Sequence, residues 1–310
     1  MAIPLLPPHG QSASPSTAGP NRATRRFALA LLAAAAIASG CAAPPSAVGT
    51  AGPASIPGVA GTARMAGTTD AAATAAAPVL APGGRLRVGV YPGSPTSLVR
   101  GADGQLRGVT VELGRTLAQR LGVVFELVEF PRIAAVVDAL QVGQVDFTVT
   151  NASPARAAVV DFSTTLVDIE LGYLVLPGSP VQSVDEVDRP GRRIGVSQGS
   201  SSLAALTRQF QAATLLTAPS LQAASELLAR RQVDAFASNK AILFELADGL
   251  PGARVLPGRW GLEHLAIAVP KGRDAALPFV RVFAVEARAS GLVQRAADRA
   301  GLRGTAAPGH

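Results

Sequence analysis

Residues 144–151 read Gln-Val-Asp-Phe-Thr-Val-Thr-Asn, and residues 232–239 read Gln-Val-Asp-Ala-Phe-Ala-Ser-Asn. Both copies follow an amphipathic helical pattern, and both end on a hydroxyl residue and an asparagine. A second pair occurs in the same order, because Gly-Arg-Leu-Arg-Val-Gly-Val at 84–90 is echoed by Gly-Arg-Arg-Ile-Gly-Val at 191–196. Two echoes in one order predict a two-lobed α/β protein whose lobes share one architecture.

The segments around the first copies alternate between strand and helix patterns. Residues 109–121 have helical spacing, with Val109, Leu113, Leu117 and Leu121 on one stripe. A second helix is predicted over 133–140. Short strands are predicted over 86–90, 123–128 and 146–150. Strands that alternate with helices indicate βαβ units and a mainly parallel sheet flanked by helices in each lobe.

The composition excludes several classes of protein. The 310 residues contain one Cys, which excludes an internal disulfide framework, a Cys-based zinc site and an iron–sulfur cluster. The three His are scattered and no Gly-rich phosphate loop occurs, so no metal or cofactor is predicted. The net charge of +7 falls to +4 outside residues 1–40, and aromatic residues make up 4%. A role in nucleic-acid binding is therefore disfavoured.

The N-terminal 40 residues are typical of a bacterial export signal. Thr24-Arg25-Arg26 precedes a continuous apolar run of 12 residues at 27–38, and Ser39-Gly40-Cys41 follows. The apolar run is shorter than the about 20 residues that a membrane-spanning helix needs. Ser39-Gly40-Cys41 resembles a lipoprotein processing site, which predicts a lipid on Cys41 and anchoring at the extracytoplasmic face of a membrane. Cleavage without lipid is the alternative, and the sequence leaves open whether export is general or by the twin-arginine route.

The composition and the echoes also divide the rest of the chain. Residues 41–84 are rich in Ala, Pro and Gly and are predicted to be a flexible tether. Lobe one is predicted over 85–174 and 266–303, and lobe two over 177–262. The crossovers between the lobes are expected near 173–177 and 262–268, and residues 304–310 are predicted to be a tail.

Four strand ends are predicted to form a ligand site. In open parallel sheets, ligands bind beyond the carboxyl ends of strands, where loops and helix N-termini present free N–H groups. The four ends are Tyr91–Ser94, Thr150–Ser153, Ser197–Ser201 and Ser238–Asn239. If the lobes face each other, these ends line one cleft.

Residues 153–156, Ser-Pro-Ala-Arg, carry the most specific chemistry in these ends. Ser153 before Pro154 is predicted to cap a helix. Arg156 in its first turn would present a planar fork suited to a carboxylate. The alternative is a surface arginine paired with Asp161.

These residues resemble the extracellular solute-binding proteins, family 3, which are the polar-amino-acid receptors of ABC importers. Ser-Pro-Ala-Arg is followed by Val-Asp-Phe-Ser at 160–163, which is similar to the family's signature. Matches in register occur at 103–113, 196–201 and 267–272, so the resemblance covers 85–303. It implies a type II periplasmic-binding-protein fold with a hinge between its lobes. It also implies a monomeric receptor that delivers a small carboxylate solute to an ABC permease.

The resemblance also implies roles for individual residues. Arg156 would hold the ligand carboxylate, together with Asn151 and, in lobe two, Gly199, Ser200 and Ser201. A plain helix cap is a second role for this lobe-two turn. The ligand-site residues predicted from the strand ends and from the resemblance are Tyr91, Ser94, Thr150, Asn151, Ser153, Arg156, Ser197, Gly199, Ser200, Ser201 and Asn239.

Three positions depart from the family pattern. Asn239 stands where the family has an acid that binds the ligand ammonium, and Ser94 and Ile133 stand where it has aromatic residues. Recognition of a standard α-amino acid is therefore in doubt. Tyr91 and Trp260 are candidates for replacement packing against the ligand, and packing in the hydrophobic core is the alternative for each.

Two enzymatic alternatives remain weaker. Gly-Val-Ser-Gln-Gly at 195–199 fits a nucleophile elbow, with Asp234 and His264 following in hydrolase order, but no oxyanion segment precedes it. Some proteins that resemble this family are dehydratases of cyclic acids, which use a carboxylic acid in the cleft as proton donor. No Glu or Asp occurs at the four strand ends, so a binding protein is predicted.

Overall fold

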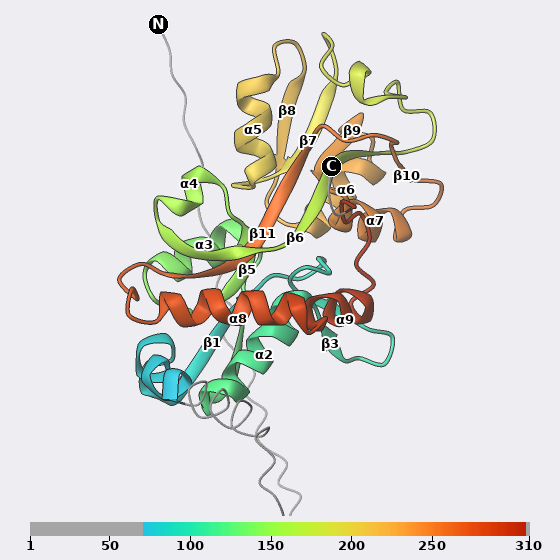
Figure 1. The fold of residues 1–310 in the computed structure, drawn as a ribbon. Helices are drawn as coiled ribbons and strands as arrows, with labels where there is room; N and C mark the ends of the chain where they lie inside the picture. Colours follow the sequence, from blue (N-terminus) through green and yellow to red (C-terminus); the bar gives the residue numbers. More distant parts are fainter. Residues whose placement is uncertain (1–70, 308–310) are drawn as a thin grey trace, which may run out of the picture. The chain divides into compact units, whose positions relative to one another are not determined.

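The computed structural model describes residues 71–307, which form two lobes of α/β structure joined by two long strands (Figure 1). Lobe one contains β1 (Arg85–Val90), β2 (Val99–Arg100), β3 (Leu106–Arg107), α2 (Val109–Leu121), β4 (Val124–Glu129), α3 (Ile133–Gln141), β5 (Thr148–Asn151), α4 (Pro154–Ala157), α8 (Leu277–Ala289) and α9 (Leu292–Arg299). Lobe two contains β7 (Arg193–Ser197), α5 (Ser201–Gln209), β8 (Thr214–Ala218), α6 (Leu221–Ala229), β9 (Ala235–Asn239), α7 (Lys240–Asp248) and β10 (Arg254–Val255). The joining strands are β6 (Val160–Val175) and β11 (Gly261–Pro270).

The main strand pairs inside each lobe are parallel, as predicted, and those of the joining strands are not. The pairs β1–β4, β7–β8 and β7–β9 are parallel. Every ladder that β6 or β11 makes is antiparallel, in a sheet ordered β5-β11-β6-β9-β7-β8 with β10 on β6. The prediction of a mainly parallel sheet is wrong for these strands. One carries the chain out of lobe one and the other carries it back, so they run in opposite directions.

The first crossover lies earlier in the chain than predicted. Residues Leu171 to Leu174 of β6 pair with β9. Leu174 is buried with Phe236 of lobe two, and Val175 with Ile194. The assignment of 171–174 to lobe one is therefore wrong. A single strand of 16 residues runs through both lobes, and nothing in its composition marks where one lobe ends.

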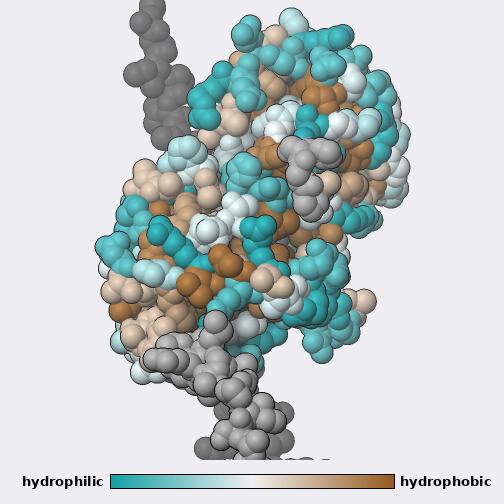
Figure 2. Space-filling view, viewed as in Figure 1, coloured by the Kyte–Doolittle hydropathy of each residue, from teal (hydrophilic) through white to brown (hydrophobic). Residues whose placement is uncertain are grey.

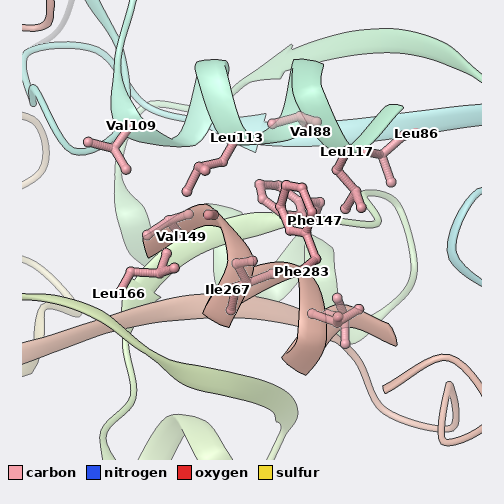
Figure 3. Close-up of a cluster of buried hydrophobic side chains, with 14 of the residues drawn as sticks. Leu86, Val88, Val109, Leu113, Leu117, Phe147, Val149, Leu166, Ile267 and Phe283 are labelled. Carbon is pink, nitrogen blue, oxygen red and sulfur yellow. The ribbon is translucent and has the colours of Figure 1, made fainter. Parts of the chain in front are cut away.

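The core of lobe one lies between α2, α8 and the sheet (Figure 3). The predicted stripe of 109–121 is the buried face of α2, which ends at Gly122 in the left-handed conformation that closes helices. Alternate residues of β1 point into the same layer, because side chains of a strand alternate between its faces. The labelled core residues are Leu86, Val88, Val109, Leu113, Leu117, Phe147, Val149, Leu166, Ile267 and Phe283.

The sequence echoes correspond to a repeated contact between an arginine and an aspartate. Arg87 N donates to Asp146 Oδ2 at 2.9 Å, and Asp146 N donates to Arg87 O at 2.7 Å. In lobe two, Arg193 N donates to Asp234 Oδ2 at 2.8 Å, and Asp234 N donates to Arg193 O at 2.7 Å. In both lobes the guanidinium also bonds to the carboxylate. In each lobe, the same arginine–aspartate contact therefore joins the first strand (β1 or β7) to the residues that precede a later strand (β5 or β9).

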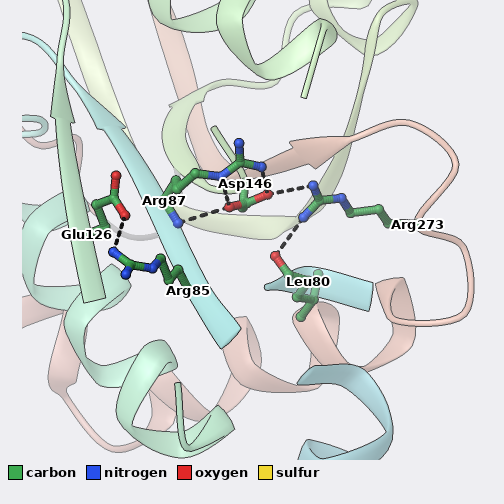
Figure 4. Close-up of polar contacts among 6 residues, drawn as sticks. All are labelled: Leu80, Arg85, Arg87, Glu126, Asp146 and Arg273. Atoms are coloured by element: carbon green, nitrogen blue, oxygen red, sulfur yellow. Dashed lines mark hydrogen bonds and ion pairs between the residues drawn. The ribbon is translucent and has the colours of Figure 1, made fainter. Parts of the chain in front are cut away.

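A helix that was not predicted completes the core of lobe one. Residues 71–80 are helical, and Ala73, Ala76 and Leu80 are buried in that core. Arg273 joins the end of this helix to Asp146: its Nη1 donates to Leu80 O at 2.6 Å and its Nη2 to Asp146 Oδ1 at 2.6 Å (Figure 4).

The predicted tether is therefore wrong for residues 71–84. Alanine is the best helix former, and small side chains spaced three and four apart can pack on a core. The earlier part of the predicted tether, the export signal and Cys41 lie outside the described residues.

The predicted tail also belongs partly to the fold. Glu170 N donates to Gly304 O at 2.9 Å, Ala306 N donates to Asp168 O at 2.9 Å, and Thr305 forms a bridge with Ile169. Residues 304–306 therefore add to the free edge of β6, which corrects the prediction for them.

Few large hydrophobic side chains of the described residues are exposed. Within residues 71–307, the large hydrophobic side chains that are exposed are four valines, Val124, Val142, Val282 and Val285. Figure 2 shows hydrophilic residues over most of lobe two and separate hydrophobic patches on lobe one. No helix in this part of the chain combines the length and apolar character needed to cross a membrane.

Candidate ligand-binding site

A cavity lies where the two lobes meet, at the carboxyl ends of β5, β7 and β9. Eight of the residues predicted for the ligand site line it: Tyr91, Thr150, Asn151, Arg156, Ser197, Ser200, Ser201 and Asn239. Three predicted residues, Ser94, Ser153 and Gly199, are not part of its lining.

Arg156 lies in the first turn of α4 and its side chain is buried. Ser153 caps this helix as predicted, because its Oγ accepts from Arg156 N at 3.4 Å. Burial lowers the pKa of the Arg156 guanidinium, and the carboxylate of Glu263 opposes this shift. Arg156 Nη1 donates to Thr150 Oγ1 at 2.6 Å. This is the one hydrogen bond that the described residues give the guanidinium, so the rest of its fork remains available.

The alternative interpretation of Arg156 as a surface residue is wrong. The side chain is 9% exposed, and its guanidinium does not pair with Asp161. Asp161 instead accepts from Lys271 Nζ at 2.6 Å.

Asn151 joins the end of β5 to β11. Its Oδ1 accepts from His264 N at 3.0 Å, and Ala152 N donates to His264 O at 2.9 Å. The oxygen of this amide is therefore engaged in the fold, and among the described residues its NH₂ group has no partner and is available to a ligand. Thr150 supplies the hydroxyl that contacts Arg156.

The turn between β7 and α5 brings lobe two against lobe one. Ser200 caps α5, because its Oγ accepts from Leu203 N at 3.0 Å. Gly199 has a φ of +68°, in the region that favours glycine, and a Cβ there would lie 2.5 Å from Ala134 Cβ of α3. The turn can approach α3 this closely only because residue 199 has no side chain. The structure therefore shows the two lobes in contact.

Both polar atoms of the Asn239 amide make hydrogen bonds within the protein. Its Oδ1 accepts from Ile242 N at 3.1 Å and so caps α7, while its Nδ2 donates to Glu263 Oε2 at 2.9 Å. The amide oxygen of Asn239 thus serves the cap of α7, and its NH₂ group faces a carboxylate of the protein.

Glu263 is the acidic residue that sequence reasoning missed. It lies on β11, is 6% exposed, and is the one acidic side chain among the described residues that lines the cavity. Glu263 lies inside a joining strand, away from the four strand ends at which the sequence predicts the ligand site. A signal existed, because Glu263 shares one face of a strand with Leu265 and Ile267, both buried.

The aromatic candidates have different positions. Tyr91 lines the cavity, and burial raises the pKa of its hydroxyl. Ser94 is buried, with its hydroxyl bonded to that of Thr96 at 2.8 Å. Trp260 lies outside the lining: its Nε1 donates to Gly172 O at 3.1 Å and its ring centroid is 6.1 Å from that of Tyr173. Of the two interpretations of Trp260, the structure supports packing in the core, because its side chain packs against the hydrophobic cluster of lobe two that contains Tyr173.

A second arginine that sequence reasoning missed also lines the cavity. Arg132 stands immediately before α3, and within the described residues its guanidinium forms no ion pair and its buried Nε has no hydrogen-bond partner. It adds positive charge to the site, which suits a ligand with acceptor groups.

The Gly-x-Ser-x-Gly residues do not form a catalytic triad. Ser197 Oγ is buried and has no hydrogen-bond partner in the described part of the chain. His264 Nδ1 bonds to Asp168 Oδ1 at 2.7 Å, and Asp234 is bound by Arg193. No group of three or more His, Cys, Asp or Glu within residues 71–307 could hold a metal ion.

Two α/β lobes, joined by two strands and meeting at a cavity with a buried arginine, define a solute-binding protein of the type II periplasmic class. The family model of bacterial extracellular solute-binding proteins, family 3, matches residues 86–301. The chain belongs to this family. Its members are binding proteins that act outside the cytoplasm, and the resemblance seen in the sequence is confirmed.

Individual proteins similar to this chain are described as receptors of amino acid transporters or of single amino acids. The chain is 24% identical over 178 residues to the ABC transporter glutamine-binding protein GlnH of Bacillus subtilis (strain 168), and the match spans 56% of this chain and 65% of that protein. The solute receptor for L-cysteine of Neisseria gonorrhoeae has a TM-score of 0.65 at 25% identity, covering 73% of this chain and 93% of that one. An amino acid ABC transporter substrate-binding protein of Streptococcus pneumoniae, bound to L-arginine, has a TM-score of 0.64 at 22% identity, covering 70% and 94%.

Proposed function

We propose that this chain is the substrate-binding component of an ABC importer. It captures a small carboxylate-bearing solute, an amino acid or a related organic acid, and delivers it to the transmembrane subunits of a permease. Its family and the transport roles named for its relatives support this proposal. We further propose that it acts as a monomer without a cofactor.

The buried guanidinium of Arg156 is the observation that carries the proposal. A cationic fork held inside an interlobe cavity has a single hydrogen bond, to a neutral hydroxyl, and no carboxylate of the described residues forms an ion pair with it. A ligand carboxylate would supply that anion through two parallel N–H···O bonds.

Hinge closure is the binding mechanism that fits the two joining strands. A ligand bound between Arg156 of lobe one and the serine turn of lobe two touches both lobes, so it favours the closed arrangement over an open one. Bending would be confined to β6 and β11, because they are the strands that pass between the lobes.

A ligand screen tests the proposed function. The protein is heated with L-amino acids, 2-keto acids, 2-hydroxy acids and dicarboxylates, and its melting temperature is recorded. A ligand at one hundred times its dissociation constant stabilises a protein by about 2.7 kcal/mol, which corresponds to a rise of about 5–10 °C at this size. If no carboxylate raises the melting temperature, the proposed function is wrong.

The same site favours a binder over the dehydratase alternative. Glu263 places a carboxyl group in the cavity, so the earlier reason against an acid catalyst no longer applies. However, Ser201 Oγ and Asn239 Nδ2 both donate to its oxygens, which holds the group as an acceptor and not as a proton donor. We therefore propose that the chain has no enzymatic activity.

We also propose that the mature protein is anchored by a lipid on Cys41. Cys41→Ser is expected to abolish incorporation of labelled lipid and to move the protein from the membrane pellet to the soluble fraction. Wild-type protein that is cleaved at another residue and recovered entirely in the soluble fraction would remove the anchor from the proposal.

A further inference from the structure

Arg156 and Glu263 are oppositely charged, buried side chains that line one cavity without forming an ion pair. Their residues are 9% and 6% exposed. Among the described residues, no cationic nitrogen lies within 4.0 Å of the Glu263 carboxylate, and no carboxylate oxygen lies within 4.0 Å of the Arg156 guanidinium. A buried charge without a counter-ion is costly, so each group gains if a ligand supplies the opposite charge.

Two neutral donors hold Glu263 in place, and neither supplies a counter-charge. Ser201 Oγ donates to Oε1, and Asn239 Nδ2 donates to Oε2 at 2.9 Å. Each carboxylate oxygen can accept a further hydrogen bond. Glu263 is therefore an oriented anion with free acceptor positions.

The register of the strands explains why Glu263 lies beside Asn239. Asn239 of β9 pairs with Leu171 of β6, and Ile169 of β6 pairs with Glu263 of β11. Residues 239 and 263 thus lie at nearly the same level of the sheet, on the two strands that flank β6. Glu263 brings a carboxylate next to the position where the family pattern has an acid and this chain has an amide.

We propose that Glu263 binds the ammonium group of the ligand while Arg156 binds its carboxylate, so that the solute is a zwitterionic α-amino acid. This inference rests on the proposed function. It answers the doubt about recognition of an α-amino acid, which followed from the amide at position 239.

Paired ligands test the inference in the wild-type protein. The probe is the L-amino acid with the largest thermal shift, measured by isothermal titration beside its own 2-hydroxy acid, which has the same shape without the ammonium. We expect the amino acid to bind at least about tenfold more tightly, because the hydroxy acid leaves the Glu263 charge unpaired. Equal or tighter binding of the hydroxy acid would overturn the inference and leave the proposed function intact. If no L-amino acid in the screen binds and another carboxylate does, the inference is overturned and the proposed function stands.

Substitution of Glu263 assigns the effect to this residue. Glu263→Gln keeps the shape and an acceptor oxygen, and we expect it to weaken amino-acid binding at least about tenfold while changing hydroxy-acid binding little. His264→Gln is the matched control, because the His264 side chain is adjacent to Glu263, exposed, and bonded to Asp168 outside the cavity. We expect this variant to bind both ligands with wild-type affinity. If Glu263→Gln retains the wild-type preference for the amino acid, Glu263 is not the ammonium site. If that variant does not fold, the wild-type pair of ligands still decides whether the site requires an ammonium.

Discussion

Replacing Asp146 with alanine is expected to lower the free energy of unfolding by about 3–5 kcal/mol, as is typical when one member of a buried ion pair is removed. The Asp146 carboxylate is fully buried and accepts from Arg87 N, from the Arg87 guanidinium at 2.7 and 2.8 Å, and from Arg273 at 2.6 Å. Its loss would leave two guanidinium groups without their anion and would loosen the contact that holds residue 80. Chemical denaturation without ligand measures the effect, and Asp146→Asn, which keeps the shape, covers the case in which the alanine variant does not fold.

Lobe two provides the control for this prediction. Asp234 makes the same backbone contacts, but its partner Arg193 has a side chain that is 46% exposed. Asp234→Ala should therefore cost less, about 1–2 kcal/mol, because a solvated arginine does not need a protein anion. Equal losses for the two variants would show that the added burial and the added arginine of lobe one contribute nothing to stability.

Replacing Arg156 with alanine is expected to weaken binding of the screened ligand by about 30-fold or more. Truncating one partner of a desolvated charge pair typically costs about 2–5 kcal/mol, and each 1.4 kcal/mol is about a tenfold change in affinity. Arg156→Lys should restore only part of the affinity, because an ammonium does not reproduce the planar fork. Isothermal titration measures both variants.

The ligand-free stability of the Arg156 variant separates a binding role from a structural one. Burial lowers the pKa of this guanidinium, so the free protein bears a cost for holding it charged. We therefore expect Arg156→Ala to melt at nearly the wild-type temperature without ligand. Unchanged ligand affinity in a folded Arg156→Ala protein would remove the carboxylate site from the proposed function.

Local sequence patterns are sufficient to predict most helices and strands of this fold. They do not predict where the chain crosses between the lobes or which distant segments pack together. The stripe of 109–121 and the echoes at 84–90 and 191–196 predict helices and strands because burial and backbone bonding act within short segments. The crossover inside β6 escapes such reasoning, because the residues on either side of it are equally suited to a strand. The Ala-rich helix of 71–80 escapes it as well, because its packing depends on Arg273, almost 200 residues later in the chain.

The candidate site shows the same limit. Arg156, Thr150 and the serine turn can be predicted because parallel strands end where ligands bind. Glu263 lies within a joining strand, and only the pairing of β11 with β6 and of β6 with β9 brings it beside Asn239. Glu263 shares a strand face with the apolar Leu265 and Ile267, which indicates burial, but the sequence does not indicate its partner.

Lobe one is built from two segments at opposite ends of the described chain, so lobe two can fold before lobe one during synthesis or export. Leu80 and Phe283 belong to one hydrophobic core, whereas the strands and helices of lobe two come from a single continuous stretch between β6 and β11. A chain that emerges from a ribosome or a membrane pore with its N-terminus first can complete lobe two while α8 and α9 are still missing. Lobe one must wait for the last helices, because closing its core requires residues separated by about 200 positions, and contacts so distant in sequence form slowly. The unfinished lobe one would expose apolar surface during this interval, so premature release from the export machinery would leave the half that carries Arg156 open to aggregation.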